Sequence, residues 1–259
     1  MSKVRSVSRA VRILEVFGQG SALTVTEVAR SLRLPKSSVY ELLATLTAEG
    51  LVEKDDGSGR YRLGLRLLDL AYAVRHNLEV SRVARPQLEQ LAARLDETVQ
   101  LTVLDRDQVL YIDGCESSRQ LRTFFDLGDR APLHCTALGK AILAFLPPPE
   151  IERIIRLKGL RRFTANTLTR ADALRAELAR TRERGYSIDN IEHEEGVRCI
   201  GAPLRDRGGA VRAAISVSGP STRLPPERDA AIARLVVQAA EEISRRLGYR
   251  PGAATGERR

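Results

Sequence analysis

The sequence predicts an α+β protein with a small helical N-terminal part and a larger C-terminal part of mixed helices and strands. In the first 50 residues, apolar positions recur at helical spacing. In the remainder, helical segments alternate with short strand-like runs, several of which are joined by hairpin-like links. This order favours an antiparallel sheet covered by helices. The length of 259 residues fits one large domain or two ordinary ones.

Residues 24–50 are the most informative stretch, because they have the pattern of two short helices around a tight corner. Thr24 and Glu27 have the spacing of a capping box, in which each side chain satisfies an unpaired amide at the start of a helix. Pro35 cannot continue that helix but suits the first turn of a new one, so we expect the corner just before it. Gly50 then ends the second helix as a C-terminal cap.

The exposed side of the second helix starts with short or polar side chains that would reach base edges or phosphates in a DNA major groove. These residues are Lys36, Ser37, Ser38 and Tyr40. Ala29 in the first helix is small, and Val39, ten positions later, is apolar, so the two helices can pack closely, as in a helix-turn-helix. Arg33 departs from the pattern, because many such motifs carry Gly in the turn. An ordinary helical hairpin is the alternative.

Two short strand-like runs, residues 51–54 and 60–63, follow the second helix and are joined by an Asp- and Gly-rich link. Such a link predicts a β-hairpin, and a hairpin directly after a recognition helix is the wing of a winged helix-turn-helix. Arg60 and Arg62 would lie near DNA phosphates, whereas the Asp pair at the tip argues against insertion of the tip itself. A solvated hairpin is the alternative.

An amphipathic helix at residues 8–17, with a basic arm ahead of it, completes a predicted winged helix-turn-helix domain at residues 1–64. Residues 65–80 are predicted to form a connecting helix with leucines on two sides. A helix that is apolar on two sides must bury both, so one side can serve its own chain and the other a partner subunit. A helix buried between two domains of one monomer explains the same pattern.

Residues 81–249 are predicted to form the second domain, followed by a Gly-, Ala- and Arg-rich tail at 250–259 that we expect to be disordered. The predicted helices cover residues 81–96, 133–146, 150–158, 170–184 and 225–247. The predicted strands cover residues 99–104, 109–113, 120–125, 185–188, 197–204 and 211–218.

Polar side chains on neighbouring strands of this domain indicate a pocket for a small carboxylate. Ser216 and Ser218 alternate on one strand and therefore share a face. Cys199 lies on the neighbouring strand, and Asp189 ends the strand before it. The helix that begins near residue 136 offers backbone amides to an anion, while hydroxyls and a thiol supply further donors. A serine bonded to backbone, a buried cysteine and an Asp in a turn are the alternatives. The candidate effector-binding residues are Thr136, Ala137, Leu138, Asp189, Cys199, Ser216 and Ser218.

Composition excludes several classes of protein. No apolar run is long enough to cross a membrane, and the N-terminus lacks a signal-peptide core, so we expect a cytoplasmic protein. Three cysteines do not suggest a disulfide framework. The net charge of +9 would help the protein find nucleic acid, but the basic residues are spread over the whole chain.

The sequence contains no recognisable catalytic motif. His134 and Cys135, together with His193 and Cys199, could form a Cys/His pair or a zinc site, but they lack the short, regular spacing of zinc ligands. There is no Gly-x-Ser-x-Gly elbow, no phosphate-binding Gly loop and no His-Glu-x-x-His. We therefore expect no enzyme activity, no cofactor and no bound metal.

Taken in this order, the segments resemble the IclR family of bacterial transcription regulators over residues 7–247. The resemblance is carried by residues 24–50, 59–64, 134–141, 185–189, 194–203 and 214–219. It implies an N-terminal winged helix and a C-terminal effector-binding domain with a GAF-like sheet. It also implies a homodimer formed through the DNA-binding half, often as a dimer of dimers.

The resemblance also implies which residues make contacts. A small carboxylate would be held at the loop–helix junction and at the Asp, Cys and paired Ser positions grouped above, with Phe124 and Leu127 closing the pocket. Some relatives bind zinc, which keeps His134 and Cys135 under consideration. The implied contacts to operator DNA are Arg9, Thr24, Lys36, Ser37, Ser38, Tyr40 and Arg60. We expect a transcriptional regulator whose affinity for double-stranded operator DNA is modulated by a small organic acid. A metabolite sensor that acts through a protein partner is the alternative.

Overall fold

The computed structural model describes residues 4–18, 20 and 22–250 of the chain. The chain divides into two compact units, Met1–Asn77 and Leu78–Arg259, each with its own apolar core. Of the tail predicted at 250–259, only Arg250 is among the described residues, and the first part of the predicted basic arm also lies outside them.

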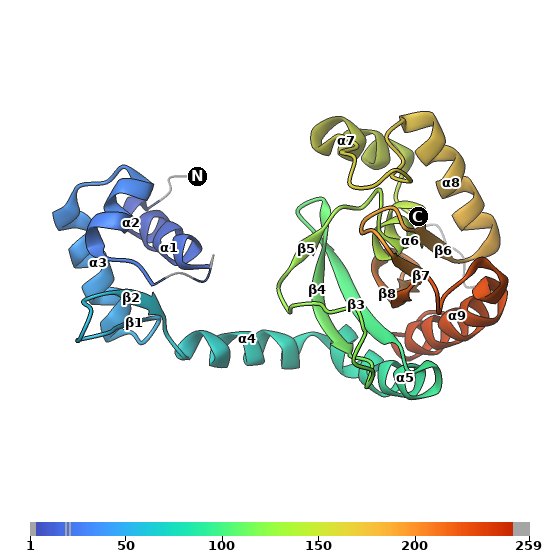
Figure 1. Cartoon of the computed structure of the whole chain (residues 1–259), viewed down its shortest axis with the longest axis horizontal. Coiled ribbons are helices and arrows are strands. Elements are labelled where there is room, and N and C mark those ends of the chain that lie inside the picture. The colour runs from blue at the N-terminus through green and yellow to red at the C-terminus, as the bar shows by residue number, and fades with distance from the viewer. Residues whose placement is uncertain (1–3, 19, 21, 251–259) are drawn as a thin grey trace, which may run out of the picture. The chain divides into compact units, whose positions relative to one another are not determined.

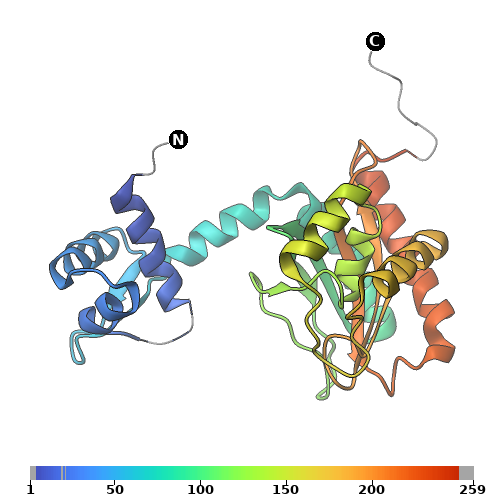
Figure 2. The same ribbon diagram turned by 90° about the horizontal axis from the view of Figure 1, so that it is seen from above.

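The N-terminal unit packs three helices against a short hairpin, and a fourth helix extends from this group (Figure 2). Its elements are α1 (Arg5–Phe17), α2 (Val25–Leu32), α3 (Lys36–Ala48), β1 (Val52–Lys54), β2 (Tyr61–Leu63) and α4 (Arg66–Asn77). The hairpin strands β1 and β2 pair antiparallel. Ile13, Val28, Val39 and Leu43 are fully buried at the centre of the core. The predicted winged helix-turn-helix is therefore confirmed.

Local contacts explain where the two helices of this motif begin and end. Glu27 accepts the Thr24 backbone N–H at 2.7 Å, and Thr24 Oγ1 accepts the Glu27 N–H at 3.3 Å, so the capping box is complete. Arg33 ends α2 in the left-handed conformation, with φ 52° and ψ 47°. The turn therefore needs a backbone conformation that glycine adopts most readily, and arginine adopts it at a cost of about 1–2 kcal/mol.

The C-terminal unit is built on an antiparallel sheet. Its strands are β3 (Thr98–Asp105), β4 (Gln108–Cys115), β5 (Arg130–Ala131), β6 (Ser187–Asn190), β7 (Val197–Arg205) and β8 (Val211–Pro220). Within the described ranges the six strands follow the order β5-β4-β3-β8-β7-β6, and every neighbouring pair is antiparallel. The helices are α5 (Glu79–Leu95), α6 (Ala137–Leu143), α7 (Pro148–Lys158), α8 (Ala171–Arg184), the 3₁₀ turn η1 (Pro226–Arg228) and α9 (Asp229–Arg246).

Helices cover both faces of this sheet, as Figure 1 shows for the C-terminal unit. Helices α5 and α9 pack on one face, and α6 packs on the other with α7 and α8 outside it. Side chains alternate along β8, so Ile215 and Val217 join the core under α5 and α9. Ala214 points to the α6 side, and Ser216 and Ser218 share that face. The predicted α+β class is confirmed.

The strand predicted at residues 120–125 is wrong, because no ladder pairing forms there. The outer edge of β4 is instead occupied by the two residues of β5. Thr123 is held by hydrogen bonds to residues on β3 and β8. Its carbonyl accepts a hydrogen bond from the Thr98 hydroxyl at 2.8 Å, and its own hydroxyl donates to the Ser218 carbonyl at 3.2 Å. The segment therefore crosses the end of the sheet and does not extend it.

The helix predicted at 133–146 is shorter than expected. Thr136 is its N-cap, because Thr136 Oγ1 accepts the Gly139 N–H at 3.0 Å, so α6 begins only at Ala137. The N-cap position also places the first turn of α6 directly over β6 and β7. Among the described residues, no helix is both long and apolar enough to cross a bilayer.

Candidate DNA-binding surface and effector cavity

The start of α3 presents the predicted DNA-contacting side chains to solvent. Lys36 and Ser37 are exposed, Ser38 is half-buried, and Tyr40 keeps 58% of its surface exposed. The opposite side of the helix is anchored by Val39, which is fully buried in the core of the unit. An exposed polar face on a helix fixed from behind is the geometry that a recognition helix needs in a major groove.

Two other predicted DNA contacts already have partners within their own unit. Arg60 Nη1 donates to the Ala22 carbonyl at 2.7 Å and lies 3.3 Å from Glu27 Oε2. Thr24 is occupied in the capping box, and its hydrogen bonds to Glu27 lower the pKa of that carboxyl, with a smaller contribution from Arg60. These contacts fix the wing against the start of α2. Arg9, the remaining predicted contact, is half-buried on α1.

All seven predicted effector-binding residues line one cavity of about 170 Å³ in the C-terminal unit. Strand register explains this convergence. Asp189 on β6 lies opposite Cys199 on β7, which in turn lies opposite Ser218 on β8. Gly201 on β7 similarly lies opposite Ser216. The polar side chains therefore form two adjacent rows on the α6 face of the sheet.

The first turn of α6 forms the facing wall of the cavity and is held tightly against the sheet. The Ser187 hydroxyl donates to the Ala137 carbonyl at 2.6 Å. A Cβ atom on Gly201 would lie only 2.9 Å from the carbonyl carbon of Ala137, so only glycine permits this approach. Ala137 and Leu138 carry amides of the first helical turn, which have no partner within the helix.

Hydrogen bonds connect the polar groups of the cavity to one another. Cys199 Sγ lies 2.6 Å from Ser218 Oγ, and Ser216 Oγ donates to Gln100 Oε1 at 3.3 Å. Burial raises the pKa of the Cys199 thiol well above its ordinary value, so the thiol stays protonated. The cavity therefore offers neutral hydroxyl and thiol groups rather than an ionised nucleophile.

Asp189 is the most perturbed acid of the cavity. Only 3% of its surface is exposed, and Asp189 Oδ1 accepts the Glu192 N–H at 2.7 Å. Burial raises the pKa of this carboxyl from 3.8 to about 7, although the Glu192 bond and the charge of Lys140 oppose the shift. Near neutral pH, Asp189 is thus poised between a hydrogen-bond donor and a buried anion.

Sequence reasoning missed several residues of the cavity wall. Gln100 carried a usable signal, because it alternates along β3 and its register partner is Ser216. Phe124 also lines the cavity as the resemblance implied, whereas Leu127 is not part of the wall. The remaining residues come from distant loops and strands, so spacing along the chain does not reveal them: Tyr111, Thr123, Phe125, Asp126, Asp129, Arg130, Ala131, His193, Glu194 and Val197.

His134 and Cys135, the two residues kept under consideration for zinc, have the following surroundings. His134 Nε2 lies 3.0 Å from the Arg161 carbonyl, and its ring lies beside that of Phe163. Cys135 is fully buried, and burial raises its pKa. Throughout the described ranges, no group of three or more His, Cys, Asp or Glu residues is arranged to hold a metal ion.

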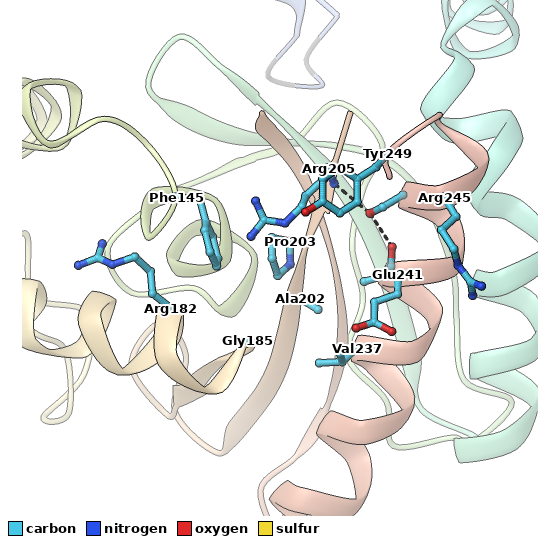
Figure 3. A pocket seen from close by; sticks show the side chains of 12 residues that line it. Phe145, Arg182, Gly185, Ala202, Pro203, Arg205, Val237, Glu241, Arg245 and Tyr249 are labelled. Carbon is cyan, nitrogen blue, oxygen red and sulfur yellow. Dashed lines mark hydrogen bonds between the residues drawn. The ribbon is translucent and has the colours of Figure 1, made fainter. Parts of the chain in front are cut away.

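A second, larger cavity of about 510 Å³ lies beside the end of β7 (Figure 3). Its arginines do not converge on a common point, since Arg182 and Arg245 point to opposite sides in the figure. Arg182 donates to the Ala144 carbonyl at 2.8 Å, and Arg205 lies over the Phe145 ring at 4.5 Å from its centroid. Because these groups are already engaged, the smaller cavity is the better candidate for a ligand site.

Comparison with known proteins agrees with both parts of this description. The family model for the IclR helix-turn-helix domain matches residues 6–56, and the model for the bacterial transcriptional regulator IclR C-terminal domain matches residues 72–245.

Two curated relatives and one solved structure illustrate the similarity. The HTH-type transcriptional regulator BhcR of Paracoccus denitrificans is 38% identical over 255 residues, covering 98% of this chain and 91% of the relative. The HTH-type transcriptional repressor AllR of Salmonella typhi is 36% identical over 251 residues, covering 96% and 92%. The IclR homolog of Microbacterium hydrocarbonoxydans complexed with 4-hydroxybenzoate superposes with a TM-score of 0.82 at 28% identity, covering 93% of this chain and 98% of that one. The chain described here belongs to the IclR family of DNA-binding transcriptional regulators.

Proposed function

We propose that this regulator is a repressor whose affinity for operator DNA changes when a small organic acid binds the 170 Å³ cavity of the C-terminal unit. The single observation that carries the proposal is the convergence of all seven predicted effector-binding residues on that cavity. Hydroxyl, thiol and amide donors around a small volume suit a carboxylate that also bears a hydroxyl or keto group. The relative with bound 4-hydroxybenzoate supports an organic acid, and the relative named a repressor supports repression.

We further propose that the chain acts as a homodimer formed through the N-terminal unit. Val4, Val7 and Val11 are 64%, 61% and 48% exposed, although they recur on one side of α1. Leu65 and Leu68, at the start of the fourth helix, are 70% and 66% exposed. Apolar stripes of this kind are covered when two subunits pack together. A dimer would also place two copies of α3 one helical turn apart on a palindromic operator.

The experiment that tests the effector assignment is a thermal-shift screen of the purified protein against glyoxylate, pyruvate, sugar acids and aromatic acids. A ligand that binds only the folded state raises the melting temperature with the logarithm of its saturation. We expect one class of acid to raise it in the wild type and not in Ser218→Ala. An equal rise in both proteins would mean that the acid binds elsewhere.

A gel shift on the DNA upstream of the protein's own gene then connects binding to regulation. We expect the acid that raises the melting temperature to change the protein concentration at which the DNA is half bound. A shifted band that no acid alters would remove the effector from the proposed function but leave the DNA-binding regulator. Light scattering on the free protein measures the subunit number, and a monomer would refute the proposed dimer.

A further inference from the structure

A buried ion pair connects two segments that line the effector cavity, helix α6 and the turn after β6, and has no place in the function proposed so far. Lys140 on α6 is completely buried, and its ammonium group pairs with Glu192 Oε1. Glu192 is also buried, with 6% of its surface exposed. Its second oxygen, Oε2, is buried without a hydrogen-bond partner in the described part of the chain. Such a pair is often no more stabilising than apolar residues of similar size, so stability alone does not explain it.

The pair joins the two facing walls of the cavity. Lys140 stands one turn after Ala137 and Leu138, which form one wall. Glu192 belongs to the turn after β6, which forms the other wall with Asp189, and its N–H donates to Asp189 Oδ1 at 2.7 Å. The Asn190 N–H also donates to Glu192 Oε1 at 3.3 Å.

The turn that directly follows β6, the strand of Asp189, is strained. Ile191 adopts φ 58°, a left-handed conformation that is a genuine outlier for a β-branched residue. Such a conformation persists only where surrounding contacts over-determine it, and it is commonly found at functional sites. Two buried threonines from the loop before α8 supply part of the restraint: Thr164 donates to the Ile191 carbonyl and Thr167 to the Glu192 carbonyl, both at 2.6 Å.

We propose that Lys140 is a positioning residue for the effector cavity: through its buried ion pair with Glu192 it holds the strained turn, and so fixes the Asp189 carboxyl opposite the first turn of α6. This inference rests on the proposed effector function of the cavity. The spacing between the two walls then determines which acids fit. Loss of the pair releases the turn, and Asp189 no longer meets the ligand at a fixed distance.

The charges of Lys140 and Glu192 shift the pKa of Asp189 in opposite directions, and a general loss of stability would not produce such opposite effects. The charge of Lys140 lowers the pKa of Asp189, and the charge of Glu192 raises it. Lys140→Met should therefore move the pH midpoint of ligand binding upward, whereas Glu192→Gln should move it downward. The other titratable groups that line the cavity or act on Asp189 stay in both variants: Tyr111, Asp126, Asp129, Arg130, Cys135, His193, Glu194 and Cys199.

The test uses the full chain and isothermal titration with glyoxylate and with pyruvate between pH 5.5 and 8.5. Because Lys140→Met leaves a buried carboxylate unpaired, Lys140→Met with Glu192→Leu is the second variant, in which the fold regains an apolar site. We expect the double variant to bind either acid at least about tenfold more weakly, by analogy with the loss of metal affinity when a group that orients a metal-binding side chain is removed. Binding equal to the wild type would overturn the proposal, as would pH midpoints that move in the same direction in the two single variants.

Glu177→Gln is the matched control. Glu177 lies on α8 and also feels the charge of Lys140, but its two carboxyl oxygens accept hydrogen bonds from Arg180 and Arg184 and not from the turn after β6. We expect its acid binding to equal that of the wild type. A loss as large as in the double variant would mean that any charge change near Lys140 suffices, which overturns the specific role of the turn.

Hydrogen exchange separates failure of this inference from failure of the proposed function. If neither acid binds the wild type, the effector assignment fails for these acids. The positioning role is then tested by the exchange rate of the backbone amide at position 192 in the free protein, corrected for the intrinsic rate of the residue present there. Faster exchange in the double variant than in Glu177→Gln supports the role, because the amide bonds to Asp189 Oδ1. An unchanged rate refutes it.

Discussion

The raised pKa of Asp189 predicts that this residue makes the protein less stable as the pH rises. In the folded protein its pKa is about 7, against 3.8 in the exposed state. Between these two values the native state binds more protons than the unfolded state, so the free energy of unfolding falls as pH rises from about 4 to 7 and is then level. Replacement by Asn keeps the shape of the side chain and removes the charge. Asp189→Asn should therefore gain stability relative to the wild type over this range.

The size of the effect follows from the shift. The pKa of Asp189 is 3.8 in the unfolded protein and about 7 in the folded one, and about two units of this interval lie above pH 5. Each unit corresponds to about 1.4 kcal/mol of the free energy of unfolding. The free energy of unfolding of Asp189→Asn should thus rise by about 3 kcal/mol relative to the wild type over this interval. Urea unfolding followed by circular dichroism at pH 5, 6, 7 and 8 measures the difference. Charged groups that do not interact with Asp189 titrate equally in both proteins and cancel in the comparison.

Ser216→Ala is the control for this experiment, because it alters the same cavity without changing a titratable group. Its stability relative to the wild type should not depend on pH. A difference between Asp189→Asn and the wild type that is also constant from pH 5 to pH 8 would show that Asp189 titrates as an exposed carboxyl. The account of Asp189 as a desolvated acid would then be refuted.

Three further predictions concern the N-terminal unit. Lys36→Ala should weaken binding to all DNA sequences and reduce the slope of log affinity against log salt concentration by about one, whereas Tyr40→Ala should change the preference among operator variants. Fluorescence anisotropy at several salt concentrations measures both effects. Equal losses of affinity on every operator would contradict base reading by Tyr40. Thr24→Ala removes the capping box and should lower the free energy of unfolding by about 1 kcal/mol in urea denaturation. Arg33→Gly relieves the left-handed conformation and should raise the same quantity by up to about 1 kcal/mol, and a decrease would show that the arginine side chain itself stabilises the corner.

Local chemistry explains which features of the fold could be predicted from the sequence. The capping box of Thr24 and Glu27 spans four consecutive residues, and its hydrogen bonds depend on little else. The strand expected at 120–125 failed because alternation of side chains does not reveal whether a sheet edge is available for pairing. The edge of β4 is taken by β5, which is too short to leave a periodic signal.

The candidate site was predictable to the extent that strand register determines it. Ser216 and Ser218 could be placed on one face from their spacing alone, and the neighbouring strands then bring Cys199 and Asp189 beside them. The turn at Ile191 could not be predicted, because an isoleucine gives no signal for a left-handed backbone. That conformation depends on contacts from segments far away in the chain, such as Thr164.

The charge state of Asp189 bears on which ligands the cavity accepts under the proposed function. A like charge nearby disfavours ionisation, so a carboxylate ligand in this cavity of about 170 Å³ and a charged, buried Asp189 would oppose one another. Burial already favours the neutral form of Asp189, whereas the first-turn amides of α6 and the serine hydroxyls can satisfy a charge on the ligand. Asp189 then donates a hydrogen bond and does not merely accept one. An acid with a keto or hydroxyl oxygen beside its carboxylate can accept that bond. We therefore expect the affinity for such an acid to fall as the pH rises through 7, because Asp189 loses the proton that it would donate.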